Sequence, residues 1–304
     1  MGKWTRRVLI TFGVIAVVGA GAYWWLILES GTPSRSYSID MSEVRRLADS
    51  MPGDKAREIH VEHIGDFAFP ATAVVAGDGW SASAMTLFSY ELVFPKSTVI
   101  IDTALTEKDG KDGGISGTYH QAAYERMSAA LRSASLIVVT HEHLDHIGGL
   151  LAQPNLKQLL AATKLNKEQF DNLARFAPNY PRDAFKGYAA LTYGKYHAVA
   201  PGVVLIRAPG HTPGSQLVYV KEANGAEYLF LGDVAWHLRN IEVVRERARL
   251  VTLMLGEDRD AVLSQLAALN ALKQKEPQIH LVPGHDPNAV AELEKAGLLV
   301  KGFR

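Results

Sequence analysis

The densest group of potential metal ligands lies between residues 140 and 149, where the sequence reads Thr-His-Glu-His-Leu-Asp-His-Ile-Gly-Gly. Its imidazoles and the carboxylate near its end, His141, His143, Asp145 and His146, directly follow the apolar run Leu-Ile-Val-Val. Neutral imidazole and carboxylate suit a borderline divalent ion such as zinc, and a strand ending in a tight turn can direct several of them at one point. We therefore expect a metal site here.

The same pattern of an apolar strand followed by a turn with histidine or aspartate recurs further along the chain. These later residues are His211, Asp233 and His285. Each alone is weak evidence, because Gly-His and Gly-Asp are common at the ends of strands. Their recurrence in order, each beside a glycine that permits close backbone approach, makes the whole set specific.

The composition excludes several classes of partner and of metal ligand. The chain has 304 residues, 32 basic and 32 acidic side chains and no cysteine. The balanced charge argues against a nucleic-acid partner, so we expect a small-molecule substrate or a partner in the membrane. The lack of cysteine excludes disulfides, a thiolate nucleophile and cysteine-ligated metal, so any ion must be held by His, Asp or Glu.

The amino terminus is typical of a membrane segment. Residues 8–28 are uncharged and almost wholly apolar, and at 1.5 Å per residue they can cross a hydrocarbon core of about 30 Å. Lys3, Arg6 and Arg7 precede them and Glu29 follows, which places the amino terminus in the cytoplasm. A cleaved signal peptide is the alternative, but its apolar core is usually only about 7–15 residues long. We expect a single-pass anchor in the inner membrane, with the catalytic domain periplasmic or extracellular.

These segments divide the chain into an anchor at 1–30, a linker with an amphipathic helix at 31–57, and a catalytic domain at 58–304. The helix is expected to begin after an N-cap at Ser42 and could pack on the domain or lie on the membrane.

Short apolar runs and helical spacing predict the elements that position the ligands. Strands are expected at 58–63, 71–75, 86–94, 97–101, 136–139, 203–207, 216–221, 227–231 and 278–282. Helices are expected at 122–132, 147–160 with a break near Pro154, 167–176, and after the caps Asp258 and Asp286.

Three stretches have two interpretations each. Asp102 is a turn residue or an acceptor for a metal-bound histidine. The segment 108–117, rich in glycine and charge, is a solvated loop or the border of a substrate cleft. The aromatic stretch 177–196 is a packed insertion or a wall of the substrate pocket.

The motifs Thr-His-Glu-His-Leu-Asp-His, Gly-His-Thr-Pro-Gly-Ser, Leu-Gly-Asp and Pro-Gly-His-Asp together resemble the metallo-β-lactamase superfamily over residues 58–304. The resemblance implies an α/β (α+β) fold, a four-layer αββα sandwich that is here preceded by one N-terminal transmembrane helix. It also implies a dinuclear site in which His141, His143 and His211 hold the first ion, Asp145, His146 and His285 hold the second, and Asp233 bridges them.

This site implies hydrolytic chemistry with two divalent metal ions, preferably Zn²⁺. Flavo-diiron oxidoreductases of the superfamily carry glutamate at the position of His143, so this histidine favours zinc, although spacing alone leaves iron and manganese open. Two ions about 3.5–4 Å apart share a water and lower its pKa, which yields a bridging hydroxide. Asp145 would bind metal, orient this nucleophile and relay a proton, and is the expected catalytic residue.

Among these hydrolases the chain most resembles the acyl-homoserine lactonase type, because it lacks a cysteine ligand and ends soon after His285. It departs at Trp236, where those lactonases place a tyrosine that assists the carbonyl oxygen. We expect Trp236 to form a pocket wall. Either His237 or Tyr193 then contacts the substrate instead, or the substrate differs.

The sequence therefore predicts a membrane-anchored dinuclear zinc hydrolase that attacks an ester, lactone or thioester carbonyl. A phosphodiesterase or a β-lactamase-type hydrolase on the same site is the alternative. A non-catalytic metal-binding sensor is disfavoured, because no ligand is missing.

Overall fold

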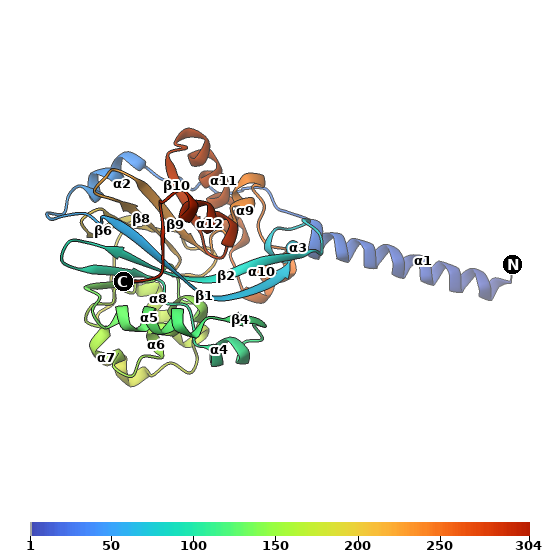
Figure 1. Ribbon diagram of the computed structural model, residues 1–304. Coiled ribbons are helices and arrows are strands. Elements are labelled where there is room, and N and C mark those ends of the chain that lie inside the picture. Colours follow the sequence, from blue (N-terminus) through green and yellow to red (C-terminus); the bar gives the residue numbers. More distant parts are fainter. Residues whose placement is uncertain (1) are drawn as a thin grey trace.

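The computed structural model describes residues 2–304, so Met1 of the expected anchor lies outside the described residues. Two β-sheets face each other and helices cover their outer surfaces (Figure 1). The first sheet has the strand order β11-β1-β2-β3-β5, with β4 paired to β1, and the second has the order β10-β9-β8-β7-β6. The strands of the first sheet are β1 (Glu58–Pro70), β2 (Ala82–Val93), β3 (Thr98–Ile101), β4 (Gly117–Tyr119), β5 (Leu136–Val138) and β11 (Val300–Lys301). Those of the second are β6 (Tyr196–Ala200), β7 (Val203–Arg207), β8 (Gln216–Lys221), β9 (Glu227–Gly232) and β10 (Ile279–Pro283).

The helices fall into an amino-terminal segment and two outer layers. The amino-terminal segment is α1 (Lys3–Tyr23), which continues as the π-helix η1 (Trp24–Leu28). The others are α2 (Met41–Ala48), α3 (Ala71–Val74), α4 (Glu107–Asp112), α5 (Gln121–Leu131), α6 (Leu144–Leu151), α7 (Leu156–Leu159), α8 (Lys167–Phe176), the 3₁₀ turn η2 (Arg182–Phe185), α9 (Leu238–Val243), α10 (Arg249–Leu255), α11 (Arg259–Lys275) and α12 (Pro287–Lys295).

Apolar side chains fill three layers between these elements. Along β7, Val203 and Leu205 pack between the sheets, whereas Val204 and Ile206 pack under α2 and α11. Successive side chains of a strand point to opposite faces, so a strand covered on both sides reads as the continuous apolar run seen here. A third cluster, with Ile147 at its centre, fills the space between the first sheet and helices α5 to α8. The expected mixed α/β architecture of two sheets is confirmed.

Several sequence predictions are corrected by the structure. Residues 71–75 form the short helix α3 instead of a strand, because Pro70 ends β1 and its fixed φ suits the start of a helix. The N-cap of α2 is Asp40 and not Ser42: its Oδ1 accepts hydrogen bonds from the backbone N–H groups of Ser42 and Glu43 at 3.0 and 3.1 Å. Short apolar runs do not separate a strand from a helix by periodicity alone.

Other expectations hold. Helix α8 and strand β7 have the expected bounds, and Asp258 and Asp286 cap α11 and α12. Helix α2 packs on the second sheet through Val44 and Ala48, which settles the choice left open for it. Helix α6 begins at Leu144, earlier than expected, and brings the end of the histidine-rich stretch into its first turn.

Helix α1 extends away from the domain (Figure 1), and its described residues are not buried. The segment Lys3–Leu28 is long and apolar enough to cross a membrane, judged by length and composition. Its exposure separates it from the core helix of a soluble domain, which would be covered by other elements. Insertion into a membrane stays a prediction.

Candidate metal centre

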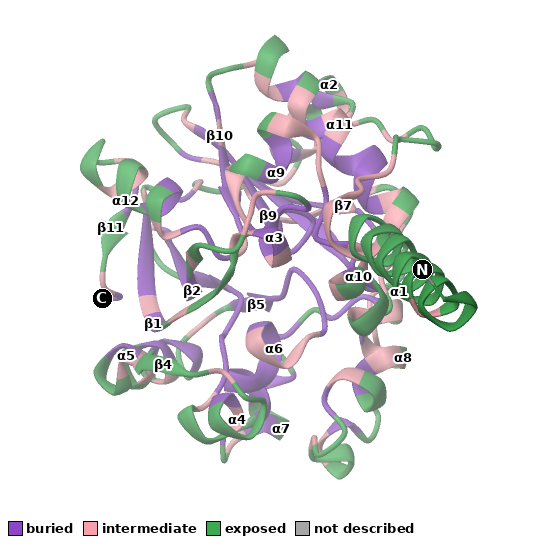
Figure 2. Ribbon diagram, turned by 90° about the vertical axis from the view of Figure 1, so that its right-hand side faces the viewer, coloured by how far each residue is buried: buried purple, intermediate pink, exposed green. Residues whose placement is uncertain are grey.

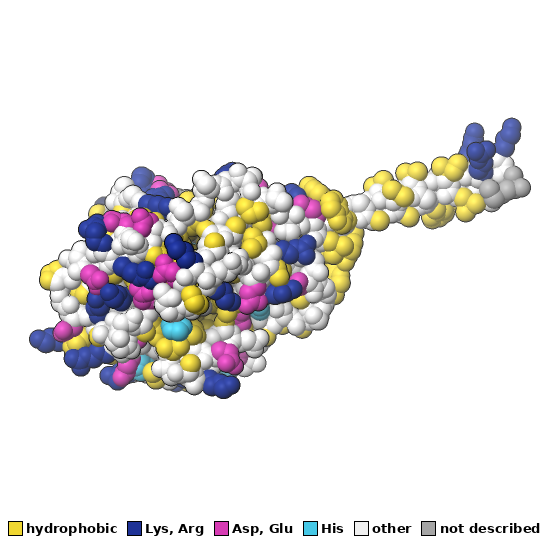
Figure 3. All heavy atoms as spheres, turned by 90° about the horizontal axis from the view of Figure 1, so that it is seen from above, with side chains coloured by type: hydrophobic (Ala, Val, Ile, Leu, Met, Phe, Trp, Pro, Cys, Tyr) yellow, Lys and Arg dark blue, Asp and Glu magenta, His cyan; other side chains and the backbone are white. Residues whose placement is uncertain are grey.

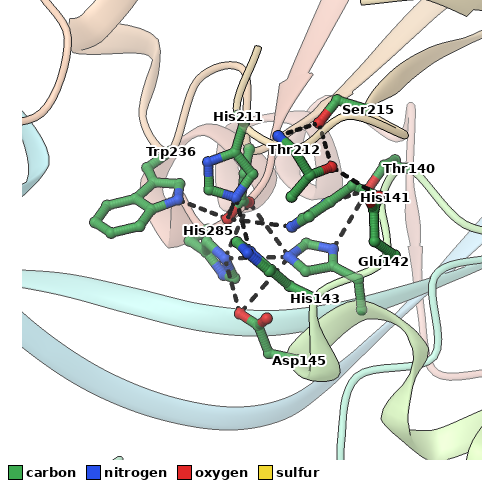
Figure 4. Close-up of polar contacts among 12 residues, drawn as sticks. Thr140, His141, Glu142, His143, Asp145, His211, Thr212, Ser215, Trp236 and His285 are labelled. Carbon is green, nitrogen blue, oxygen red and sulfur yellow. Dashed lines mark hydrogen bonds and ion pairs between the residues drawn. The ribbon is translucent and has the colours of Figure 1, made fainter. Parts of the chain in front are cut away.

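Loops from both sheets and the first turn of α6 bring the seven predicted ligands together, and Figure 4 labels His141, His143, Asp145, His211 and His285 among them. The first group contains His141, His143, His211 and Asp233, and the second contains Asp145, His146, Asp233 and His285. Within each group the potential ligand atoms all lie within 4.8 Å of one another. The family resemblance implied the same division, with Asp233 shared by both groups.

Asp233 presents one carboxylate oxygen to each group. Its Oδ2 lies 3.2 Å from His211 Nε2 and 3.7 Å from His141 Nε2. Its Oδ1 lies 3.1 Å from His285 Nε2 and 3.3 Å from His146 Nε2. This arrangement fits a carboxylate that bridges two cations.

The donor atoms fit metal ions better than they fit one another. His141 Nε2 and Asp233 Oδ1 are buried and have no hydrogen-bond partner among the described residues. Buried polar atoms without a partner cost free energy, so one such atom in each ligand group fits a bound ion at each of the two positions. His146 Nε2 also faces His285 Nε2 at 3.4 Å, a contact that two metal-binding nitrogens explain more simply than a hydrogen bond.

The surroundings keep several of these groups in the protonation state that binds metal. Burial lowers the pKa of His143 to about 3, and burial together with neighbouring His146 holds the pKa of His141 well below its usual value, so both imidazoles stay neutral. Burial alone would raise the pKa of Asp233, but the charges of His285 and His146 hold it well below its usual range. Its side chain is therefore a carboxylate.

Asp102 positions His146. Of the two interpretations of Asp102, the contacts therefore support that of an acceptor for a histidine. Its Oδ2 accepts a hydrogen bond from His146 Nδ1 at 2.9 Å, and its Oδ1 accepts one from the backbone N–H of Thr140 at 2.6 Å. Asp102 has a left-handed φ of 57°, a conformation that aspartate tolerates better than most residues. Orienting hydrogen bonds of this kind fix the histidine ring so that Nε2 points to the metal position.

A buried carboxylate that sequence reasoning missed orients His211. Glu257 accepts hydrogen bonds from His211 Nδ1 and from the guanidinium of Arg247, and the side chains of Glu257 and Arg247 are both buried. The same guanidinium lies 4.7 Å from the ring centre of Trp236. Glu257 precedes α11 and belongs to no motif, so only the fold could reveal its partner.

Glu142, inside the histidine-rich stretch, joins two ligand loops. Its carboxylate accepts hydrogen bonds from Thr212 Oγ1 at 2.7 Å and from the backbone N–H of Gly214 at 3.1 Å. A Cβ atom on Gly214 would lie 2.5 Å from this carboxylate, so glycine is required for the contact. Glu142 thus holds the loop of His211 against the loop of His141.

A cavity of about 440 Å³ opens in front of the ligands. Its wall is mostly apolar and includes Phe67, Phe69, Met85, Leu105, Ile115, Trp236, Val251, Met254 and Leu255 beside His143, Asp145, His211, Asp233 and His285. Asp109, Gly113 and Ile115 place the segment 108–117 at its border as one of the two interpretations expected, although residues 108–112 belong to helix α4 and not to a loop. The segment 177–196 instead packs against α7 and α8 through residues such as Phe185 and Tyr188, as a packed insertion.

The predicted substrate contacts lie in different parts of the structure. Trp236 is part of the cavity wall as expected, and its Nε1 donates a hydrogen bond to Asp233 Oδ2 at 2.7 Å. Tyr193 lies elsewhere: its hydroxyl donates to Gln216 Oε1 at 2.5 Å and its ring packs between the sheets. His237 caps the start of α9 and is not among the residues that line the cavity. Neither Tyr193 nor His237 lines the cavity among the described residues, so a substrate contact by either, or a different substrate, stays a prediction.

Replacing Glu257 tests its positioning role. Glu257→Gln is expected to lower the affinity for zinc about 10-fold to 100-fold, because His211 loses the charged acceptor that orients its ring. Competition with a chromogenic chelator measures this affinity. Glu242→Gln, a change of the same kind at an exposed residue, is the control and should leave it unchanged, and equal affinities of the two variants would contradict the role.

Comparisons with known proteins agree with this geometry. Residues 87–285 match the family model described as the metallo-beta-lactamase superfamily. An N-acyl homoserine lactonase of Bacillus thuringiensis is 24% identical over 221 residues, a match that covers 66% of this chain and 82% of the lactonase.

Solved structures share the fold. An N-acyl homoserine lactone hydrolase with the product N-hexanoyl-L-homoserine bound at its catalytic metal centre superposes with a TM-score of 0.59 at 18% identity, covering 80% of this chain and 96% of that one. A dizinc quorum-quenching lactonase in complex with a product gives a TM-score of 0.50 at 15% identity, covering 77% and 90%. At these identities the likeness concerns the fold alone.

Proposed function

The chain belongs to the metallo-beta-lactamase superfamily, and from this premise we propose that it is a membrane-anchored dinuclear zinc hydrolase that cleaves an ester, lactone or thioester carbonyl bond. As a metallo-hydrolase it has relatives of the lactonase type. The observation that carries the finer proposal is the pair of four-ligand groups that share Asp233 at the end of an apolar cavity.

The ligands are proposed to hold two ions. His141, His143, His211 and Asp233 would hold one ion, and Asp145, His146, Asp233 and His285 the other. Two divalent ions held there supply a Lewis acid for the carbonyl oxygen and lower the pKa of water toward neutrality. Zinc is proposed because the donors are imidazoles and carboxylates without thiolate.

Asp145 is proposed as the residue that moves the proton. Its side chain is 24% exposed, more than that of Asp233, and it forms part of the cavity wall. Its Oδ2 lies 3.5 Å from His285 Nε2 and 3.7 Å from His146 Nε2, on the side of the second group. One oxygen can therefore face a metal while the other holds a proton for the leaving oxygen.

The cavity favours a carbonyl substrate over a phosphodiester. Its lining, among the described residues, contains aromatic and aliphatic side chains but no lysine or arginine. Phosphate groups are usually bound by arginine or lysine as well as by metal. An acyl group fits this wall better, and a phosphodiesterase is the weaker candidate.

Metal removal tests the chemistry. We expect the full-length protein, purified in detergent, to contain two zinc ions per chain and to hydrolyse members of a panel of lactones, thioesters, β-lactams and phosphodiesters. A chelator should abolish this activity and added zinc should restore it. His211→Ala should lower kcat/KM by at least about 10²-fold, because it removes a ligand of the first ion and leaves its buried partner Glu257 without the imidazole.

The matched control is His280→Ala, which removes a histidine that belongs to neither ligand group. Fewer than one metal per chain, or activity that His211→Ala leaves unchanged, would reject the dinuclear mechanism. A preference for β-lactams or phosphodiesters would replace the proposed substrate class.

The proposed location is the inner membrane, with the domain on its outer side. Support comes from the exposed apolar helix and from Lys3, Arg6 and Arg7 at its amino-terminal end. We expect a reporter enzyme fused after Arg304 to lie outside the cytoplasm. A reporter that works only outside the cytoplasm should therefore be active. Activity of the reporter only in the cytoplasm would overturn this orientation.

A further inference from the structure

The carboxyl-terminal end of the apolar helix is fixed to the catalytic domain. Residues 26–30 are half-buried. Thr72 Oγ1, in α3, donates a hydrogen bond to the carbonyl of Ile27 at 3.1 Å, and Arg245 donates one to the carbonyl of Leu28 at 2.8 Å. Such direct contacts between the chain's anchor and two parts of the domain leave little freedom for the domain to swing.

Glu29 completes this attachment. Its Oε2 accepts hydrogen bonds from Arg249, in α10, at 2.5 Å and from Arg259, in α11, at 2.8 Å. Burial opposes ionisation of Glu29, but the two guanidinium groups hold its pKa below the usual value. The guanidinium of Arg249 also lies 4.6 Å from the ring centre of Trp25. Helix α10 is thus held against the end of the apolar helix.

Exposed apolar side chains gather at this same end of the domain. After Glu29, the large hydrophobic residues that are exposed in the described chain are Phe69, Trp80, Leu250, Leu253, Met254 and Val300. All but Val300 belong to α10 or to the segment around α3. Trp80 donates a hydrogen bond to the hydroxyl of Tyr23, at the end of α1, at 2.9 Å. Figure 3 shows apolar side chains collected at the base of α1.

The exposed apolar residues of α10 and of the segment around α3 form an apolar rim. This rim continues into the cavity in front of the ligands. Phe69 and Met254 line the cavity and are also 37% and 79% exposed. On α10, Val251 and Leu255 face the cavity while Leu253 is 61% exposed. Figure 2 looks at the end of the domain from which α1 projects and shows α3 and α10 there. One short helix therefore contacts both the anchor and the substrate space.

The length of the span places this rim at a membrane surface. Residues 8–28 rise about 30 Å as a helix, which is the thickness of the hydrocarbon core. With the basic residues before position 8 on one side, Leu28 lies at the opposite boundary. Helices α3 and α10 contact this part of the chain and must lie at the same depth. Trp and Tyr side chains such as Trp80 and Tyr23 are favoured at such an interface.

We infer that the mouth of the catalytic cavity rests on the outer leaflet of the anchoring membrane, and that the enzyme draws from that leaflet an amphiphilic substrate with a long acyl chain. The inference rests on the proposed function and adds the substrate class and its route. A long acyl chain partitions into the bilayer, and a continuous apolar path lets it reach the metal centre without crossing water.

Contact with the membrane is tested on the full-length protein in vesicles of phosphatidylcholine and phosphatidylglycerol. The chain has no cysteine, so Leu253→Cys carries a single environment-sensitive fluorophore. We expect brominated lipids to quench it at least about threefold more than the same label on Val300→Cys, the exposed control position. Equal quenching at both positions would overturn the inference.

The substrate class is tested with homoserine lactones that carry a butanoyl or a hexadecanoyl chain, the latter incorporated in the same vesicles. Leu253→Asp should lower kcat/KM for the hexadecanoyl lactone at least about 10-fold and leave the butanoyl lactone within about twofold, since Leu253 does not line the cavity. Val300→Asp should change neither value.

The outcomes separate the two proposals. If both lactones are hydrolysed equally well by Leu253→Asp and by the unaltered protein, membrane capture is wrong while the hydrolase stands. If the unaltered protein hydrolyses neither lactone and contains no zinc, the proposed function itself is wrong and the inference falls with it.

Discussion

Asp233→Ala is expected to lower kcat/KM by at least about 10³-fold, which corresponds to about 4 kcal/mol of transition-state stabilisation. The carboxylate is the only residue common to both ligand groups within the described chain, with one oxygen beside each. Its loss removes a ligand from both positions and leaves four buried histidines without the negative charge between them. Steady-state kinetics and elemental analysis measure the effect, and metal content should fall below two ions per chain.

Asp171→Ala is the matched control, because Asp171 is an exposed aspartate paired only with Lys167 on the same helix. It should retain full activity and metal. Asp233→Asn adds a second test, since it preserves size but removes the charge. Two bound ions and activity within about tenfold in either Asp233 variant would contradict a bridging role.

Gly149→Ala is expected to destabilise the fold by about 2–3 kcal/mol, although alanine is the better helix former. A Cβ at this position in α6 would lie 2.0 Å from the backbone oxygen of Thr103 and 2.8 Å from Met127 Cε. The oxygen cannot move aside, because the N–H of Thr103 donates to the carbonyl of His146 at 2.7 Å. Overpacking would therefore separate α6 from the loop that carries Asp102. Chemical denaturation measures the loss.

Gly194→Ala serves as the control for this change. A Cβ there meets no atom within 4 Å, so the substitution should leave stability within about 0.5 kcal/mol. If Gly149→Ala is as stable as this control, the close approach of α6 to the Thr103 loop is not important to the fold. Metal affinity measured on the same sample shows whether His146 is displaced together with the helix.

The ligands were predictable because metal chemistry leaves local marks in a sequence. Each follows an apolar strand, either in a loop or in the first turn of α6, and the glycine beside His211, Asp233 and His285 marks where backbones approach closely. Apolar runs, such as that of β7, predicted the individual strands, whereas the arrangement in two sheets was implied by the family resemblance. The roles of the seven residues in binding ions stay predictions.

What could not be predicted depends on contacts between distant segments. Glu257 and Arg247 reach His211 from a separate part of the chain, and no spacing rule connects them. Tyr193 is a candidate for the pocket because it belongs to the aromatic stretch 177–196, but its ring packs against the apolar cluster between the sheets. The attachment of the apolar helix through Glu29 could not be predicted either, because no spacing rule connects Glu29 with Arg249 and Arg259.

The order in which the ligands occur along the chain has a consequence for synthesis. The histidines between residues 141 and 146 are made first, and His211, Asp233 and His285 follow in that order. A ribosome that stops early therefore releases a fragment without a complete centre. The first ligand group is complete once Asp233 has been made, whereas the second stays incomplete until His285 has been added.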